Sequence, residues 1–511
     1  MKKAKKQAIV NQRVDILNSE LSKIKLDKNL KCNEKIIKNL FQNTDTIVYR
    51  NVENRSNKLW KGFIAYSDGL VNSTIINENI IRPIFSSTIL ENNDCIITTI
   101  MNQVILINEI QKTNDMVTIV QSITYGDTIL FIDGYDEALI LNTKSFETRA
   151  IAEPDSEKII QGPKEGFSEA LLKNLSMIRR RVRTNLLKMQ YVTLGEITQT
   201  KACVCYIDGI VKPEILADLM DRLSRIKIDA IIDSNYVAEM IKNSKLSPFT
   251  TAGHTQRPDV VVGKLMEGRI ALFVDGTPVV LTVPYLFIEN FQNNEDYYLN
   301  FYYSSFSRLL RLIGFFCTIF VPAIYVTVVA YHFEMLPSSL LINFAVDQNT
   351  VPLPASLELF VLLVVFDILR ETGVRMPSSV GQALSIVGAL VIGDAAVNAR
   401  LVASPTIIVV AIAGITNLLV PKMSGPVLIM RYSLLLSASL FGSIGISLGV
   451  AVFMSHIFSL ESFGVAYVLS DEKLTLQNAK DTLIRSPWWF MKTRDKNLTN
   501  NTLRQKSQRK I

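Results

Sequence analysis

The hydrophobic and polar positions divide the chain into two halves with different patterns. In the first half, short apolar runs alternate with segments whose apolar residues recur at helical spacing. That alternation predicts an α/β layer fold. A stretch containing Pro154, Gly162 and Pro163 interrupts the pattern, which predicts a boundary. The sequence therefore predicts two soluble α/β subdomains, at residues 29–153 and 154–300.

Individual elements follow from the local pattern in each subdomain. The first subdomain is predicted to hold a helix at 30–41 and strands at 59–65, 96–107, 116–123 and 128–141. The second is predicted to hold helices at 166–188, 213–225 and 236–242 and strands at 191–199, 202–207 and 230–232.

One short pattern, an apolar run that ends in Asp-Gly, recurs four times. The copies are IAYSDG (64–69), ILFIDG (129–134), VCYIDG (204–209) and ALFVDG (271–276). Asp-Gly after a strand predicts a tight turn, because glycine adopts positive φ without strain. The alternative is a carboxylate displayed at a ligand cleft. Two copies fall in each subdomain, which suggests a duplicated α/β design.

The second half, residues 301–459, contains long apolar runs that predict an all-α, multi-pass membrane domain. Four runs are long enough to span a bilayer, at 309–332, 380–399, 401–420 and 432–455. A fifth run, 353–369, is unusual because only eight uncharged residues separate Glu358 from Asp367. Those residues cover about 12 Å of helix, against a hydrocarbon core of about 30 Å. The run is predicted to be a short or re-entrant helix that faces a bundle interior or an aqueous path.

Small residues predict close helix packing in two of the spans. Ridges of this kind let helix backbones approach closely, within one chain or between copies. The residues concerned are Gly381, Ser385, Ala389 and Gly393 in one span, and Gly445 and Gly449 in the last. Span 380–399 also contains Gln382 and Asp394, which suit a protein-facing surface better than a lipid-facing one.

Charge is distributed unevenly along the chain. Residues 1–28 form a basic N-terminal arm, residues 309–459 contain six basic and six acidic residues, and residues 460–511 contain ten basic and five acidic residues. The net charge of +7 comes mostly from the two ends, so it predicts no nucleic-acid surface. Beyond Lys492 the tail is polar and basic, which predicts disorder.

Basic residues beside the spans predict the orientation in the membrane. Arg308 and Arg311 precede the first span, whereas the loop 333–354 contains no Lys or Arg. Positive charge favours the inner side, so the soluble region and the tail 460–511 are predicted to be cytoplasmic. An even number of crossings follows, and four full spans satisfy it. Five crossings would place the tail outside.

The titratable residues do not have the pattern of an enzyme or metal site. Five cysteines and three histidines are scattered without ligand spacing, so the sequence predicts no enzyme, no metal and no cofactor. A basic cluster spreads around the helix at 166–188; it consists of Arg179, Arg180, Arg181 and Arg183. These arginines are expected either to contact anionic lipid or a neighbouring subunit, or to form a solvated helix surface.

Seven motifs occur in consistent order between residues 155 and 495. They are GPKEGFSEALLKNLSMIRRRVR (162–183), EGRIALFVDGTPVVLTVP (267–284), EDYY (295–298), ILRETG (368–373), QALSIVGALVIG (382–393), SFGVAY (462–467) and KDTLIRSPWW (480–489). Together they resemble the GerA family of spore germination proteins, the A subunits of germinant receptors.

The resemblance implies a multi-pass protein of the spore inner membrane without enzyme activity. It implies partners: a transporter-like B subunit, a lipoprotein C subunit and further copies of the chain, which form a ring that conducts ions when nutrients are sensed. A related stage V sporulation membrane protein shares these motifs, so that role stays open. Family members also carry two glutamates where this chain has Leu363 and Asp367. The resemblance therefore implies a less acidic path here.

Two hypotheses for the polar residues of the membrane domain stay open. In the first, carboxylates line a cation path in an oligomer; the carboxylates are Glu358, Asp367, Glu371 and Asp394, with Arg370 and Gln382 beside them. In the second, the chain is a non-conducting scaffold or signal relay in which carboxylates pair locally, as Asp367 with Arg370 at i+3. A secondary transporter is less favoured, because no internal repeat is visible in the membrane half. Asp367 and Glu371 share a helix face and Glu358 lies half a turn away, so Asp367 is the main candidate.

Overall fold

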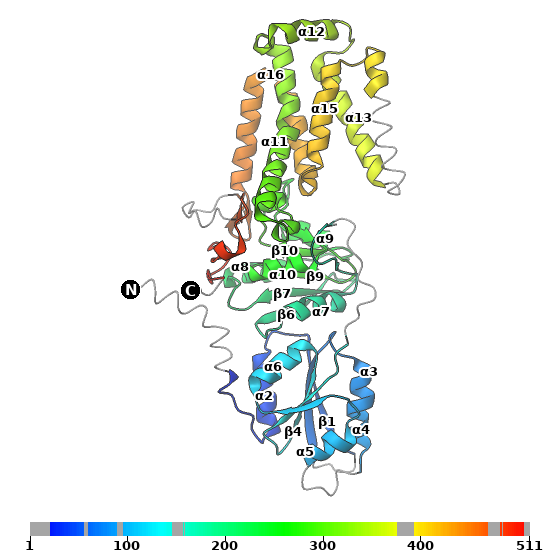
Figure 1. The fold of residues 1–511 in the computed structure, drawn as a ribbon, viewed down its shortest axis with the longest axis vertical. Helices are drawn as coiled ribbons and strands as arrows, with labels where there is room; N and C mark the ends of the chain where they lie inside the picture. The colour runs from blue at the N-terminus through cyan, green and yellow to red at the C-terminus, as the bar shows by residue number, and fades with distance from the viewer. Residues whose placement is uncertain are drawn as a thin grey trace, which may run out of the picture.

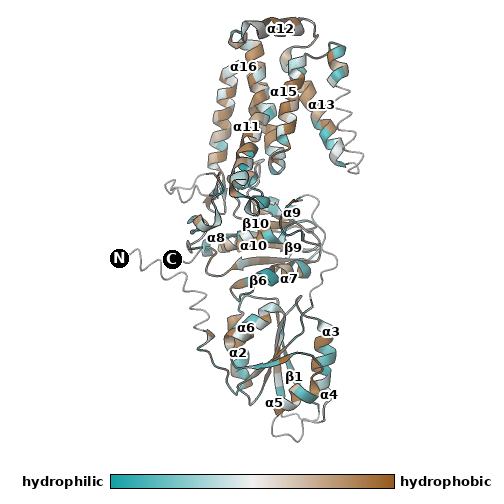
Figure 2. Ribbon diagram, in the orientation of Figure 1, coloured by the Kyte–Doolittle hydropathy of each residue, from teal (hydrophilic) through white to brown (hydrophobic). Residues whose placement is uncertain are grey.

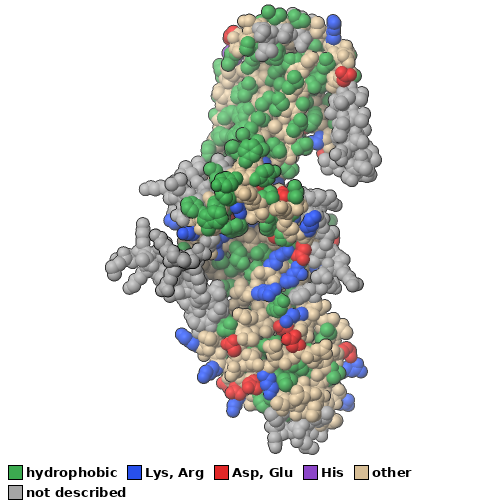
Figure 3. Space-filling view, viewed as in Figure 1, with side chains coloured by type: hydrophobic (Ala, Val, Ile, Leu, Met, Phe, Trp, Pro, Cys, Tyr) green, Lys and Arg blue, Asp and Glu red, His purple; other side chains and the backbone are tan. Residues whose placement is uncertain are grey.

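The computed structural model describes residues 21–55, 60–88, 96–145, 157, 159–375, 393–468, 481–482 and 484–504. Three bodies follow one another along the long axis: a first sheet with its helices, a second sheet with its helices, and a bundle of long helices (Figure 1). The bundle is mostly hydrophobic, whereas the sheet bodies mix hydrophobic and hydrophilic segments (Figure 2). Hydrophobic side chains cover the visible face of the bundle, and charged ones are spread over the sheet bodies (Figure 3). The predicted α/β region followed by a helical domain is confirmed.

The first body is a five-stranded antiparallel sheet between two helical layers. In the sheet order, its strands are β1 (Ile47–Glu53), β2 (Lys61–Ser67), β4 (Thr128–Ile132), β5 (Ala138–Leu141) and β3 (Ile110–Thr113). One layer is α2 (Leu30–Leu40) and α6 (Met116–Tyr125); the other is α3 (Ser73–Ile75), η1 (Ile76–Ile81), α4 (Arg82–Ser86), α5 (Ile96–Thr99) and η3 (Ile100–Val104). Alternate residues of β4 face the two helical layers. Phe131 packs with α2 and α6, and Leu130 packs with the opposite layer.

Two strands predicted in the first body are wrong, because residues 96–107 and 116–123 are largely helical. The β-branched composition of 116–123 predicts a strand, yet local signals select a helix. The Asp115 side chain accepts hydrogen bonds from two backbone N–H groups of the first turn, and Gly126 ends the helix with φ of 103°. Apolar residues at helical spacing then face the sheet.

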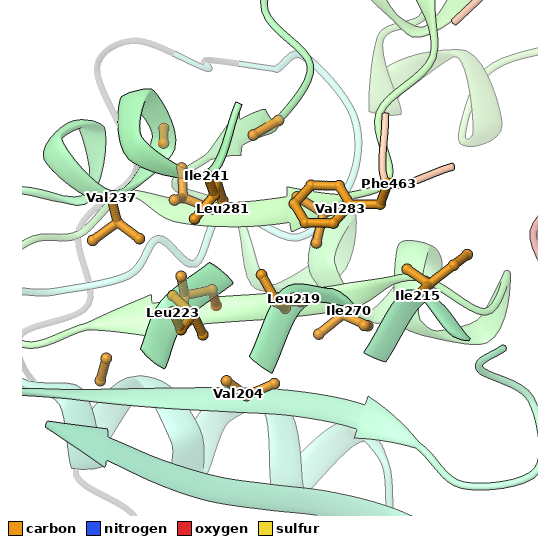
Figure 4. Packing of buried hydrophobic residues seen from close by; sticks show 14 of the residues in the cluster. Val204, Ile215, Leu219, Leu223, Val237, Ile241, Ile270, Leu281, Val283 and Phe463 are labelled. Atoms are coloured by element: carbon orange, nitrogen blue, oxygen red, sulfur yellow. The ribbon is translucent and has the colours of Figure 1, made fainter. Parts of the chain in front are cut away.

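The second body repeats the three-layer arrangement. In the sheet order, its strands are β6 (Leu187–Leu194), β7 (Thr200–Ile207), β9 (Ile270–Val274), β10 (Val280–Val283) and β8 (Gly253–Thr255). Helices α7 (Leu171–Arg181) and α10 (Pro258–Met266) cover one face, and α8 (Pro213–Ser224) and α9 (Ser234–Ile241) cover the other. Leu219 of α8 and Val237 of α9 lie in the same apolar cluster as Val204 of β7 (Figure 4). The strand predicted at 230–232 is wrong; these residues form a loop.

The two sheet bodies are topological copies of each other, which confirms the predicted duplication. Both have the same strand order, and the strands β2, β4, β7 and β9 are each followed by an Asp-Gly turn with positive glycine φ. Asp133 Oδ1 accepts a hydrogen bond from Leu30 N at 3.1 Å. In the second copy, Asp275 Oδ1 accepts one from Leu171 N at 3.0 Å. These two carboxylates therefore hold the first turns of α2 and α7, and the tight-turn interpretation is confirmed.

In the arginine cluster at 179–183, Arg179 and Arg183 contact the first sheet body, so the interpretation as a solvated helix surface is wrong for Arg179. Arg179 is 1% exposed and reaches Thr46 Oγ1 of the first body at 3.5 Å. Burial lowers the pKa of Arg179 to about 10. The Arg183 guanidinium lies 3.9 Å from the ring centroid of Tyr125, also in the first body. Arg180 and Arg181 pair with Glu165.

The helical body is built from α11 (Phe301–Tyr331), α12 (Ser338–Asn349), α13 (Ala355–Arg375), α15 (Ser404–Asn417) and α16 (Ser424–Ser459). In the described part of the chain, α11 and the segment Pro421–Ser459 are long and apolar enough to cross a membrane. Helix α15 runs antiparallel to α11, because Tyr325 and Thr406 hydroxyls lie 2.9 Å apart at one end, and Thr318 and Thr416 hydroxyls 2.8 Å apart at the other.

Two of the predicted membrane segments differ in length from the helices observed. The helix predicted as short at 353–369 is α13, with 21 residues; they extend about 31 Å. Helix α13 continues past Asp367 because that charge has a buried partner, described below. The span predicted at 401–420 contains the 14-residue α15. Most of the span predicted at 380–399 lies outside the described residues.

Helix α16 is a helical hairpin, so the single span predicted at 432–455 is wrong. Gly442 has φ of 57° and ψ of −134°, and the helix reverses there. A Cβ at Gly445 would meet the carbonyl oxygen of Ser437, and a Cβ at Gly449 would meet the side chain of Leu434. These pairs straddle Gly442, as expected for two antiparallel halves. The structure thus places both glycines at a contact within one chain.

The end of the described chain packs on the second body, so the disorder predicted beyond Lys492 is wrong up to residue 504. Leu498 is 3% exposed and belongs to the apolar cluster of α8. Thr499 forms a bridge with Val211, and its hydroxyl donates to the carbonyl oxygen of Ile210. One apolar side chain with local hydrogen bonds orders this polar segment.

Adding one methyl group to a glycine of α16 tests the hairpin. Gly445→Ala is expected to lower the free energy of unfolding by about 1–3 kcal/mol, because the methyl group overpacks the contact between the two halves. Gly425→Ala is the matched control, since a Cβ there meets no atom within 4 Å. Thermal unfolding of the purified variants in detergent measures both. Equal stability of the two variants would contradict the hairpin.

Candidate functional site

A buried carboxylate connects the helical body to the second sheet body. Asp296, in the short helix η6 (Asn294–Tyr297), is 1% exposed. It accepts hydrogen bonds from Arg308 Nε and Arg311 Nη1, each at 2.9 Å. Both arginines belong to the first turns of α11, and Ser304 adds a hydrogen bond to the Asp296 carbonyl at 2.8 Å. The base of α11 is thus held at one point of the soluble region.

The segment after the membrane helices joins the same cluster. Asp481 Oδ1 accepts a hydrogen bond from Arg308 Nη1 at 2.9 Å, and Asp481 Oδ2 accepts one from the Tyr297 hydroxyl at 2.7 Å. Burial raises the pKa of Asp481, and Arg308 opposes that shift. Arg485 donates to the Tyr297 carbonyl at 3.2 Å. We call Asp296, Arg308, Arg311 and Asp481 the junction clamp.

A second buried ion cluster stiffens the sheet body beneath the clamp. Glu289 pairs with Arg269 and, at 2.7 Å, with Lys264. Burial acts to raise the pKa of Glu289, but the two cations outweigh it and lower that pKa to about 2. Glu289 Oε1 also accepts a hydrogen bond from Leu286 N at 2.8 Å. The start of β9, α10 and the chain before η6 are therefore tied together.

In the helical body, Asp367 pairs with an arginine that the sequence did not single out. Arg431 of α16, 1% exposed, donates to Asp367 Oδ2, and the Tyr432 hydroxyl donates to the same oxygen at 2.8 Å. The hypothesis of a local Asp367–Arg370 pair is wrong, since the partner lies on another helix. A charge pair between two apolar helices holds α13 against the first half of α16.

The other predicted polar residues of the helical body lie apart from this pair. Glu358 is 1% exposed and accepts a hydrogen bond from Ala403 N, 2.6 Å away, at the start of α15. Glu371 pairs with Arg375 at 2.6 Å on an exposed surface. Asp394 is exposed at the start of a short helical stretch. Of these three carboxylates, Glu371 lines the same surface groove as Asp367, described below, and Glu358 and Asp394 do not.

The small-residue ridge can be placed only in part. Gly381, Ser385 and Ala389, together with Gln382, lie outside the described residues. At Gly393, a Cβ would be 4.0 Å from the Ile407 side chain at the start of α15.

An open groove of about 560 Å³ runs along α13 beside the Asp367–Arg431 pair. Its lining includes Asp367, Arg370 and Glu371 from α13 and Leu428 and Tyr432 from α16. Polar groups at this depth of an apolar bundle mark a functional surface by default. No group of three or more metal-ligating side chains occurs among the described residues.

Breaking the buried pair tests how much it stabilises. Arg431→Ala is expected to cost about 3–5 kcal/mol, because it leaves Asp367 as an uncompensated charge between helices. Arg375→Ala is the matched control, since it breaks an exposed pair worth at most about 0.5 kcal/mol. Thermal unfolding in detergent measures both. A loss in Arg431→Ala no larger than in the control would contradict the assignment.

Comparisons with known proteins cover most of the chain. A family profile described as Bacillus/Clostridium GerA spore germination protein matches residues 35–497. Spore germination protein KA of Bacillus subtilis (strain 168) is 38% identical over 428 residues, which cover 83% of this chain and 78% of that protein. The uncharacterized membrane protein YfkQ of the same organism is 38% identical over 438 residues, covering 85% of this chain and 84% of that protein.

One solved structure is also similar to part of this chain. It is the crystal structure of the N-terminal domain of the A subunit of the Bacillus megaterium spore germinant receptor GerK3, with 30% identity and a TM-score of 0.42. The match covers 52% of this chain and 98% of that one. On the extent of the profile match and the identity to relatives along most of their length, the chain belongs to the GerA family of spore germination proteins.

Proposed function

We propose that this chain is the A subunit of a spore germinant receptor. In this proposal it oligomerises in the spore inner membrane and forms a cation-conducting complex that opens when nutrients are sensed. The observation that carries the proposal is the open groove along α13, which Asp367 and Glu371 line beside the apolar helices. Carboxylates repeated around a ring of subunits attract cations.

The proposed partners are those of the family: a transporter-like B subunit, a lipoprotein C subunit and further copies of this chain. The soluble region is proposed to be cytoplasmic. The chain before α11 and the segment after α16 both contribute to the junction clamp. Both ends of the helical body therefore lie on one side, which supports an even number of crossings in a multi-pass protein.

A non-conducting signal relay is the second candidate function, and the Asp367–Arg431 pair favours it. An arginine beside the carboxylate cancels most of its attraction for a passing cation. The junction clamp supports a relay as well, because a rotation of the second sheet body displaces the base of α11 directly. The two candidates differ in what happens when Asp367 loses its charge.

Liposomes containing the purified chain are expected to pass monovalent cations. Asp367→Asn should reduce the flux by roughly tenfold, the effect of about 1.4 kcal/mol, because Arg431 then presents a positive charge to the path. Asp221→Asn, at an exposed ion pair of α8, is the matched control. Assembly is checked by size-exclusion chromatography. Unchanged flux in Glu358, Asp367 and Asp394 variants alike would exclude conduction through this region.

The relay through the clamp is tested in spores. Asp481→Asn keeps one oxygen that accepts from Arg308 and replaces the other with an amide nitrogen that can donate to the Tyr297 hydroxyl, while it removes the charge, so a stability loss of about 1 kcal/mol is expected. Spores with this variant are expected to contain a normal amount of the protein, measured by immunoblot, and to germinate more slowly with nutrient. The Asp221→Asn variant should behave as wild type. A normal nutrient response in Asp481→Asn spores would show that the clamp carries no signal.

A further inference from the structure

A cavity of about 400 Å³ lies where the second sheet body meets the turn between α15 and α16. Its wall includes Glu157, His254, Lys264, Asn290, Arg311 and Lys422, which come from six separate parts of the chain. The volume suits a small molecule or a head group. The cavity shares no lining residue with the groove along α13.

Three of the four Lys and Arg side chains in the wall already have a carboxylate partner. Lys264 Nζ lies 2.7 Å from Glu289 Oε2. Arg257 Nη2 lies 2.9 Å from Asp259 Oδ2. Arg311 Nη1 lies 2.9 Å from Asp296 Oδ2 in the junction clamp.

Lys422 is the fourth cation, and its environment differs. Its charged neighbours are Glu157, Glu289, Lys264 and Arg311. Glu157 Oε2 accepts hydrogen bonds from the Thr255 hydroxyl at 2.8 Å and Gln256 N at 3.0 Å. Within the residues that the structure describes, no carboxylate oxygen lies within 4.0 Å of Lys422 Nζ. Lys422 thus lines the cavity without a carboxylate partner, near Lys264 and Arg311, whose charges are already paired.

The backbone that presents Lys422 is firmly held. Val420 and Met423, on either side of it in the turn, are 2% and 1% exposed. They pack in one apolar cluster with Phe249 and Tyr285 of the soluble region. A lysine fixed in this way loses little further backbone freedom on binding a ligand, which favours a preformed site.

We propose that this cavity binds a small anion, a phosphate or carboxylate group, with Lys422 as its principal cation. Thr282 and Asn293 add polar side chains to the wall. The bound anion supplies the missing counter-charge and touches both the α15–α16 turn and the second sheet body, so it stabilises their contact. The group comes either from a solute or from a phospholipid head group, because the turn lies at the base of the apolar bundle (Figure 2).

Titration of the full-length protein distinguishes the two sources. In detergent, inorganic phosphate is expected to raise the unfolding temperature of the wild type if a solute anion binds. In lipid nanodiscs, phosphatidylglycerol added to phosphatidylcholine is expected to raise it if a head group binds. Lys422→Gln should need about a tenfold higher concentration of the stabilising anion for the same rise in unfolding temperature, because a charge-assisted contact is worth about 1.5 kcal/mol or more. Lys422→Arg should show the same anion-dependent rise in unfolding temperature as the wild type.

Lys112→Gln, an exposed lysine on β3, is the matched control and should respond as wild type. A second readout needs no variant: the active anion should protect Lys422 of the wild type from acetylation, measured by mass spectrometry. The proposal is overturned if neither anion stabilises the wild type. It is equally overturned if Lys422→Gln and wild type respond alike, or if Lys422 is acetylated at the same rate with and without the anion.

Discussion

The buried carboxylate of Asp296 is the interaction on which the connection between soluble region and membrane helices depends. It receives two arginines from one turn of α11, so that helix cannot tilt or rotate without losing charge-assisted hydrogen bonds. Each such bond is worth about 1.5–3 kcal/mol, and a buried partner left unpaired costs more. Asp481, from the segment after α16, is the third part of the chain that contributes to the cluster. The junction therefore ties the second sheet body to the base of α11 through several buried charge-assisted contacts.

The same physics explains the charge inside the apolar bundle. A lone carboxylate in a lipid-facing helix costs free energy, so the charges within 353–369 predict a helix that is too short to span a bilayer. Once Arg431 and Tyr432 contact Asp367, the helix continues through the charge. The pair is weak evidence for stability, since two well-packed apolar side chains would hold the helices as well.

The sequence predicts those features of the structure that are determined by residues adjacent in the chain, and it misses those that depend on residues far apart. The strand–turn pattern IAYSDG and its three relatives indicate the duplication, because strand, turn and glycine φ are set by adjacent residues. Asp367 is visible as an anomaly in its own helix. Its partner Arg431 is not, because 64 residues separate them and only folding brings them together. The reversal at Gly442 also escapes prediction, since the apolar run 432–455 passes through it without a proline or a charged residue and a single backbone conformation decides it.

The two copies of the duplicated fold make different contacts with the rest of the chain. The second copy takes Phe463 and Leu498, from the segment after the membrane helices, into its own core. It thereby packs directly on the chain that follows the helical body. The first copy meets the second through Arg179 and Arg183 and a short bridge between Thr44 and Met189. Among the described residues, the first copy thus connects to the helical body through the second copy, and the junction clamp lies between the second copy and α11.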